Sequence, residues 1–128
     1  MSVCLDSWVV LAWLDAEQPA QARIEGFLET RPTISWINAV EVYYRLERDH
    51  GRTQADQVLA ELRIALTLDL PSTTRMVEAA RLKAQLPIAL ADCFAIATAL
   101  AHDLTLLTGD PEILDREVPC RVEDLRSR

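Results

Sequence analysis

The segment VCLDSWVVLAWL (residues 3–14) decides the expected fold, because it changes from one structural pattern to another within a few residues. Its first three residues are apolar, and Asp6 and Ser7 end this short run as they would end a buried strand. The apolar run from Trp8 to Leu14 has no polar face, which is typical of a helix buried on several sides. We therefore expect a strand followed at once by a helix, the opening unit of an α/β domain.

The rest of the chain continues this alternation. The expected helices and strands are helices over 21–29, 38–50, 53–66, 74–85 and 90–102, and strands over 33–36, 66–70, 104–107 and 118–122. A capping-box-like Thr53-x-x-Asp56 pattern opens the third of these helices. Strands that alternate with helices predict a three-layer α/β/α fold with a mainly parallel central sheet of four to five strands. At 128 residues the chain is expected to form a single domain over 1–128.

The composition is that of a globular protein, with half of the residues apolar and 26% charged. No apolar run approaches the roughly 20 residues that a membrane helix needs. The apolar N-terminal stretch has no basic residue before it, unlike a secretory signal peptide. We therefore expect a cytoplasmic protein that does not cross a membrane.

The three cysteines are spread along the chain. Cys4, Cys93 and Cys120 are odd in number, far apart and embedded in apolar sequence. This spacing fits neither a disulfide framework nor a metal knuckle. Buried free thiols are the expectation.

Four acidic residues follow strands or open helices of the expected fold: Asp6, Glu41, Asp92 and Asp110. The carboxyl ends of parallel strands share one edge of a sheet, so acids at these transitions can converge on one crevice. Asp92 is the most informative, because the helix around it is otherwise almost entirely apolar and a lone buried carboxylate is costly. Clustered carboxylates repel one another and take up protons unless a cation with a preference for oxygen ligands neutralises them. The pattern favours a Mg²⁺ or Mn²⁺ site.

Each acid taken alone also has a structural explanation. Asn38-x-x-Glu41 matches a capping box, and Asp110-Pro111 matches an N-cap followed by proline at the first helical position. Asp92 is placed where a negative charge complements a helix dipole. Both explanations stay open for any one residue, and only the conjunction of four acids favours a single site.

The net charge of −7 counts against a nucleic-acid enzyme, because affinity for a phosphate backbone usually comes from clustered Lys and Arg. A bound divalent cation reverses the local field and offsets this objection. Arg45, Arg48 and Arg52 follow Glu41 and can contact substrate phosphates, although exposed arginines on a helix are more commonly a solvated face.

Four segments of the chain resemble the acidic motifs of PIN domains, in the order in which that family carries them. The segments are VCLDS (3–7), NAVEVY (38–43), LADCFAIA (90–97) and LLTGDP (106–111). They span nearly the whole chain, and the last two are the most specific. One departure is Trp8, where many relatives carry a small polar residue, so that hydrogen bonds to Asp6 are expected from Ser7 and Thr108.

The resemblance implies an endoribonuclease that hydrolyses RNA phosphodiester bonds by metal-activated water. In that scheme Asp6, Asp92 and Asp110 bind Mg²⁺, or Mn²⁺ in its place, and Glu41 completes the catalytic site. Small size and motif style are similar to VapC-type toxins. This implies one half of a toxin–antitoxin pair, with a cognate antitoxin and a second copy of the chain as partners.

Other classes explain the acids less well. A phosphotransfer receiver would use Asp69 as phosphoacceptor, but its usual lysine after the last strand is missing, since the only lysine is Lys83. A haloacid-dehalogenase-type phosphatase needs an Asp where Trp8 stands. The three glycines are too few and too scattered for a P-loop or a dinucleotide fingerprint. A non-catalytic PIN-like interaction module remains the alternative, and the tryptophans and tyrosines are expected in the core or an interface.

Overall fold

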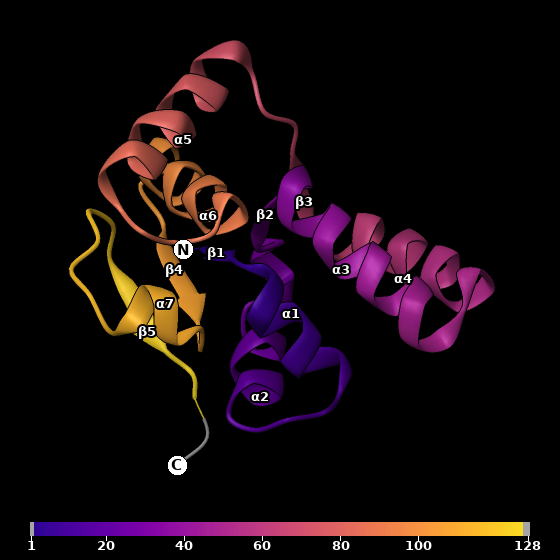
Figure 1. Ribbon diagram of the computed structural model, residues 1–128. Coiled ribbons are helices and arrows are strands. Elements are labelled where there is room, and N and C mark those ends of the chain that lie inside the picture. Colours follow the sequence, from indigo (N-terminus) through magenta and orange to yellow (C-terminus); the bar gives the residue numbers. More distant parts are fainter. Residues whose placement is uncertain (1, 127–128) are drawn as a thin grey trace.

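A parallel sheet of five strands forms the centre of the protein, whose computed structural model describes residues 2–126 (Figure 1). The strands are β1 (Val3–Leu5), β2 (Thr33–Ser35), β3 (Thr67–Asp69), β4 (Thr105–Thr108) and β5 (Val122–Asp124). Their order in the sheet is β3-β2-β1-β4-β5, and every neighbouring pair is parallel. The strands β2 and β3 are added on one side of β1, and β4 and β5 on its other side, so the strand order reverses between β1 and β4. Open α/β sheets place their ligand sites at such a switch point.

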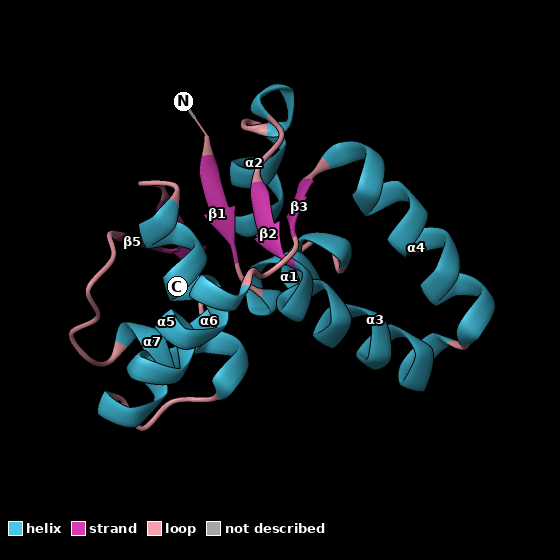
Figure 2. Ribbon diagram, turned by 90° about the horizontal axis from the view of Figure 1, so that it is seen from above, coloured by secondary structure: helices cyan, strands magenta, loops and turns pink. Residues whose placement is uncertain are grey.

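Helices connect these strands. They are α1 (Ser7–Leu14), α2 (Ala20–Glu25), α3 (Trp36–His50), α4 (Arg52–Ala65), α5 (Thr73–Gln85), α6 (Leu90–Ala101) and α7 (Pro111–Leu114), with a short 3₁₀ turn at Leu28–Thr30. Figure 2 shows α3 and α4 packed along each other and projecting away from the sheet. Within residues 2–126, no helix has the length and apolar character that a bilayer crossing requires.

The strands bury alternate side chains on opposite faces of the sheet. Leu5 and Leu107 belong to a core shared with α1, α2, α3 and α4. Cys4 and Leu106 belong to a second core shared with α5 and α6. This period-two division follows from the geometry of a strand, and it confirms the predicted three-layer fold.

The predicted fifth strand, 118–122, is placed too early. The strand β5 occupies Val122–Asp124, and its ladder with β4 pairs Leu106 with Val122. Pro119 has no N–H to donate, so it interrupts a ladder over the predicted range. Val118 is instead a partly buried residue packed against the second core.

The helices α2, α3, α4 and α5 each begin one or two residues before their predicted starts, and α2 ends at Glu25 rather than at residue 29. The helix α3 begins at Trp36, and its cap is Ser35, whose hydroxyl accepts a hydrogen bond from the amide of Ile37 at 3.2 Å. The helix α4 begins at Arg52 without a side-chain cap, so Thr53-x-x-Asp56 is no capping box. Gly51 ends one helix and opens the next.

The backbone conformation of Gly51 determines where α3 ends and α4 begins. Gly51 has φ of +89°, a conformation that favours glycine over any residue with a Cβ. Its amide still donates to the carbonyl of Glu47 at 3.0 Å, while its own carbonyl accepts from Ala55 at 3.1 Å. The α3–α4 hairpin is therefore closed by a single residue.

All three cysteines are free, as the sequence predicts. Cys4 and Cys93 are buried, and Cys120 is half-buried. Burial raises the pKa of the Cys120 thiol to about 11, so this group stays protonated near neutral pH. The same cause raises the pKa of Cys4 and of Cys93.

Candidate functional site

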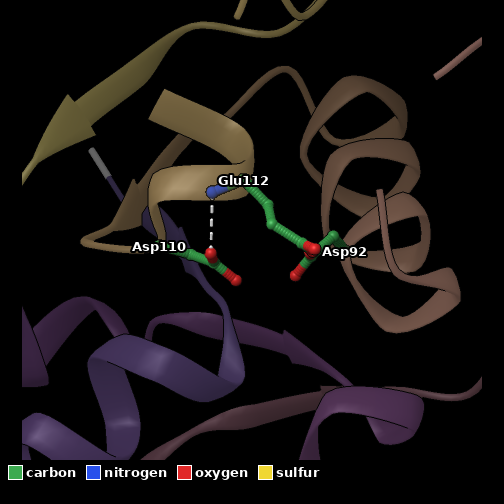
Figure 3. A group of neighbouring side chains, drawn as sticks. All are labelled: Asp92, Asp110 and Glu112. Atoms are coloured by element: carbon green, nitrogen blue, oxygen red, sulfur yellow. Dashed lines mark hydrogen bonds between the residues drawn. The ribbon is translucent and has the colours of Figure 1, made fainter. Parts of the chain in front are cut away.

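Three carboxylates meet between the start of α6 and the start of α7. Asp92, Asp110 and Glu112 each offer one oxygen atom, and these atoms all lie within 4.8 Å of one another (Figure 3). Asp92 stands in the first turn of α6, whereas Asp110 and Glu112 flank the first residue of α7. The spacing of these oxygens is compatible with shared binding of one cation.

The carboxylate of Asp92 is buried and incompletely hydrogen-bonded. Its residue is only 6% exposed, and its Oδ2 atom has no hydrogen-bond partner among the described residues. Burial, followed by the charge of Asp110, the adjacent carboxyl group of Glu112 and the charge of Asp6, raises the pKa of Asp92 well above its usual range. Carboxylate oxygens are the ligands that hard divalent cations prefer, so the donor set present here fits such an ion.

Asp6 lies directly after β1 and is 1% exposed. Its Oδ1 accepts a hydrogen bond from the amide of Val9 at 2.8 Å, and its Oδ2 accepts one from the hydroxyl of Thr108. Burial raises its pKa to about 7 although both hydrogen bonds oppose the shift. The carboxylates of Asp110 and Glu41 also raise it, so Asp6 belongs to the same electrostatic neighbourhood.

Thr108, the last residue of β4, connects two of the acids. Its hydroxyl donates to Asp6 and accepts a hydrogen bond from the amide of Asp110 at 3.0 Å. Asp110 in turn caps α7, because its Oδ1 accepts from the amide of Glu112 at 2.9 Å. The N-cap predicted for Asp110-Pro111 is therefore confirmed, and the cap also holds the carboxylate in one orientation.

The sequence predicts that Ser7 holds the carboxylate of Asp6, but the structure places its hydroxyl elsewhere. Ser7 donates its proton to the carbonyl of Asn38 at 3.2 Å and accepts a hydrogen bond from the Asn38 side chain at 3.2 Å. The same amide group donates to the carbonyl of Ala91 at 3.1 Å. Asn38, on α3, thus connects α1 to α6, and its contact on α6 is the residue that precedes Asp92. Helix-capping patterns do not predict this role.

Glu41 is half-buried in the second turn of α3. Since α3 begins at Trp36, the capping-box explanation of Asn38-x-x-Glu41 does not apply. The charge of Glu41 contributes to the raised pKa of Asp6, but Glu41 is not one of the three carboxylates that converge within 4.8 Å.

The residue that sequence reasoning missed is Glu112. Its Oε2 accepts a hydrogen bond from the amide of Ala89 at 3.2 Å, and Ala89 is the N-cap of α6 with no side-chain cap of its own. Glu112 therefore caps α6 from a neighbouring helix while it faces Asp92. The available signal was the Asp-x-Glu spacing, which puts a second carboxylate in the first turn of α7.

Two of the three arginines that follow Glu41 are paired with acids at the surface. Arg48 pairs with Asp49 at 2.9 Å, and Arg52 pairs with Glu47 at 3.1 Å, both on the exposed side of the α3–α4 hairpin. Arg45 is half-buried and lies one turn beyond Glu41. This distribution agrees with a solvated face for the two outer arginines.

Asp69, considered above as a phosphoacceptor, is held in an ionic network at the far end of the sheet. Its carboxylate contacts Arg75 at 2.6 Å and His102 at 3.0 Å. An acid paired in this way with a cation has an ordinary structural role.

Solved structures with the same architecture include two of VapBC and one of a VapC toxin. The structure of VapBC2 from Rickettsia felis bound to a promoter DNA fragment matches with a TM-score of 0.79 and 19% identity, covering 98% of this chain and 100% of that chain. DNA-bound VapBC from Salmonella typhimurium matches with a TM-score of 0.79 and 18% identity, covering 97% and 98%. VapC20 from Mycobacterium tuberculosis, described as a sarcin-ricin loop cleaving toxin, matches with a TM-score of 0.70 and 14% identity, covering 94% and 99%.

At these identities the likeness is one of fold. None of the curated protein sequences compared with the chain matches it. The family model of the PIN domain, however, matches residues 3–117, a span that includes all four acidic motifs, every residue of the two buried cores except Leu125, and the group at Asp92. The chain belongs to the PIN-domain family.

Proposed function

We propose that this protein is a Mg²⁺-dependent endoribonuclease, and that it is the toxin of a VapBC-type toxin–antitoxin pair. The observation that carries the proposal is the buried carboxylate of Asp92, whose Oδ2 lacks a hydrogen-bond partner within residues 2–126 and which faces Asp110 and Glu112. A protein gains nothing in stability from such an arrangement, because repulsion and burial both oppose it. A site that binds a cation explains it.

Asp92 and Asp110, with Glu112 beside them, would hold the ion, and Asp6 would complete its surroundings from β1. When bound, Mg²⁺ supplies a counter-charge for phosphodiester oxygens and makes water a stronger nucleophile; Mn²⁺ is the expected substitute.

The remaining residues of the site orient these acids. Thr108 holds Asp6 and Asp110 in fixed relative positions, since one hydroxyl bonds to both residues. Glu41, on α3, would complete the acidic site or orient the attacking water. Its proximity to Asp6 supports this role.

The partners follow from the same proposal. The RNA substrate would enter at the carboxyl edge of β1 and β4, next to the acids. A cognate antitoxin is supported by the VapBC complexes of the structural neighbours. A homodimer is supported by the half-exposed apolar residues Met76, Val77 and Leu100 on α5 and α6, which a second copy would cover.

Cleavage of RNA by the purified protein tests the nuclease. We expect cleavage with Mg²⁺ or Mn²⁺, no cleavage with excess EDTA, and none by the Asp92→Asn variant. Asp115→Asn is the matched control, because Asp115 is an exposed acid paired with Arg126 at 3.3 Å. Undiminished cleavage in EDTA would overturn the metal mechanism. Full activity of Asp92→Asn would remove Asp92 from the site.

Growth arrest tests the toxin role separately. Induced expression of the wild-type chain should stop growth, and coexpression of the protein encoded next to it should restore growth and copurify. Growth unaffected by an active nuclease would refute the toxin assignment and leave the nuclease assignment intact.

A further inference from the structure

A hollow of about 190 Å³ lies beside the acidic site, and its composition differs from that of the site. Its lining residues are Trp8, Leu11, Ala12, Asp15, Glu17 and Arg45. They come from α1, from the turn that follows it, and from α3, which packs against α1. None of these residues belongs to the four acidic motifs.

Trp8 connects the hollow to the site. A Cβ placed on Gly109 would lie 2.1 Å from the six-membered ring of Trp8, so the indole is packed directly on the glycine backbone. Gly109 stands between Thr108 and Asp110, and Trp8 itself follows Asp6 by two residues. The ring that walls the hollow therefore touches the segment that carries the acids. Arg45, on the other wall, lies one helical turn beyond Glu41.

The charged side chains of the hollow are not paired with one another, although the charge of Arg45 acts on Asp49 of the same helix. Throughout residues 2–126, the side chains of Asp15, Glu17 and Arg45 make no hydrogen bond and no ion pair. Both acids are exposed, whereas Arg45 and Trp8 are half-buried. A guanidinium, two carboxylates and a partly buried aromatic ring thus line one hollow, and the three charged groups make no hydrogen bond within residues 2–126.

This set of groups selects the chemistry of its ligand. Two carboxylates beside one guanidinium repel a phosphate, and carboxylates can only accept hydrogen bonds. Trp8 packs against the first core and lines the hollow with the part of its indole that stays exposed, and an exposed aromatic ring is a stacking surface for an unpaired base. Guanine offers acceptors that suit arginine, at O6 and N7, and two adjacent donors, its ring N–H and its amino group, that suit carboxylates.

We propose that this hollow binds an unpaired guanine of the RNA, in a nucleotide next to the cleaved phosphodiester. The base stacks on Trp8, Arg45 donates to its acceptor edge, and Asp15 and Glu17 accept from its N–H groups. The inference rests on the proposed function, because it assumes that the substrate is RNA. To the proposed nuclease, the inference adds a preference for guanine beside the cleaved bond.

Fluorescence of Trp8 tests this inference without any cleavage step. The variant Trp13→Phe/Trp36→Phe leaves Trp8 as the only indole in the chain, and Asp92→Asn is added to it to prevent hydrolysis. Short single-stranded oligoribonucleotides with one guanine are titrated against matched oligonucleotides with inosine, which lacks the amino group, or with adenine at that position. We expect quenching by the guanine oligonucleotide, with an affinity about tenfold higher than for the other two.

Two further variants separate stacking from base recognition. Asp15→Asn/Glu17→Gln should keep the quenching but lose the preference for guanine over inosine. Trp8→Phe, measured by fluorescence anisotropy with a labelled oligonucleotide, should weaken binding of every sequence while its thermal melting shows a folded protein. Absence of quenching by all oligonucleotides, or equal affinity for all three bases, would overturn the proposal.

The two proposals fail in different ways. If the wild-type chain cuts RNA in Mg²⁺ but Trp8 reports no preference among bases, only the guanine subsite is refuted. If Trp8 reports selective binding and no RNA is cut, the subsite stands and the nuclease assignment falls.

Discussion

Replacement of Asp92 by Asn is expected to stabilise the metal-free protein above pH 6 and to leave its stability nearly unchanged at pH 4. The amide has almost the same shape as the carboxyl group but carries no charge to bury. In the wild type, burial and the charges of Asp110 and Glu112 raise the pKa of Asp92 from 3.8 to about 8. The folded protein therefore binds a proton at Asp92 that the unfolded chain releases near pH 4.

The direction of the pH dependence follows from this proton. Where the folded state holds more protons than the unfolded state, stability falls as pH rises, so the wild type loses stability from about pH 4 to pH 8. A shift of four pKa units corresponds to a ceiling of about 5 kcal/mol at 1.36 kcal/mol per unit. Because the charge is shared with neighbouring carboxylates that can take up the proton, we expect about 1–3 kcal/mol at pH 8.

Chemical denaturation in EDTA measures this difference. Wild type, Asp92→Asn and the exposed-acid control Asp115→Asn are unfolded with urea at pH 5 and at pH 8. The stabilisation by Asp92→Asn should grow between the two values, whereas the control should change by less than about 0.5 kcal/mol at either. If Asp92→Asn is destabilised equally at both pH values, Asp92 serves only the helix dipole, and the site loses its main physical support.

Three other predictions follow from the structure. Added Mg²⁺ should raise the thermal midpoint of the wild type more at pH 8 than at pH 5, because the ion needs deprotonated carboxylates. It should raise the thermal midpoint of Asp92→Asn less. Equal gains for the wild type at both pH values would contradict metal binding at this site. Gly109→Ala should lower the free energy of unfolding by about 1–3 kcal/mol, because the new Cβ collides with the ring of Trp8. In a urea denaturation series, adding Trp8→Leu to Gly109→Ala should recover part of this loss. If the losses of the two single variants simply add in the double variant, the collision is not the cause. Asn38→Ala should cost about 1–3 kcal/mol in the same assay, since it removes the donor that links Ser7 to α6, and a neutral effect would show that the link is dispensable.

The sheet could be predicted from local patterns because its strands are short apolar runs that end in polar residues. Residues 3–5 match β1 to the residue, and Asp6 ends the strand because its side chain caps the next helix. The position of β5 could not be predicted in this way. Its first and last residues, Val122 and Asp124, are exposed, and its register depends on pairing with β4, which is distant in sequence.

The acids of the candidate site were accessible to the same reasoning, and their detailed contacts were not. Asp6 and Asp110 follow adjacent strands, so topology alone brings them to one edge. Glu112 was missed because a glutamate in the first turn of a helix is usually explained by the dipole. The bond between Ser7 and Asn38 joins residues 31 positions apart, and only the packing of α1 against α3 reveals it.

Capping and metal binding turn out to be compatible roles for these residues. Asp6 caps α1, Asp110 caps α7, and Glu112 caps α6, so three carboxylates are each fixed by an amide at a helix N-terminus. The positive ends of these helices offset part of the repulsion among the acids, which lets an acidic cluster persist in a protein with a net charge of −7. Asp92 differs from them, because its Oδ2 has no partner within residues 2–126. Replacement of Asp6 or Asp110 by asparagine, or of Glu112 by glutamine, should therefore preserve the fold and remove a charge, whereas replacement of Asp92 should relieve electrostatic repulsion. This contrast separates the acids that orient the site from the one whose charge the proposed cation would offset most.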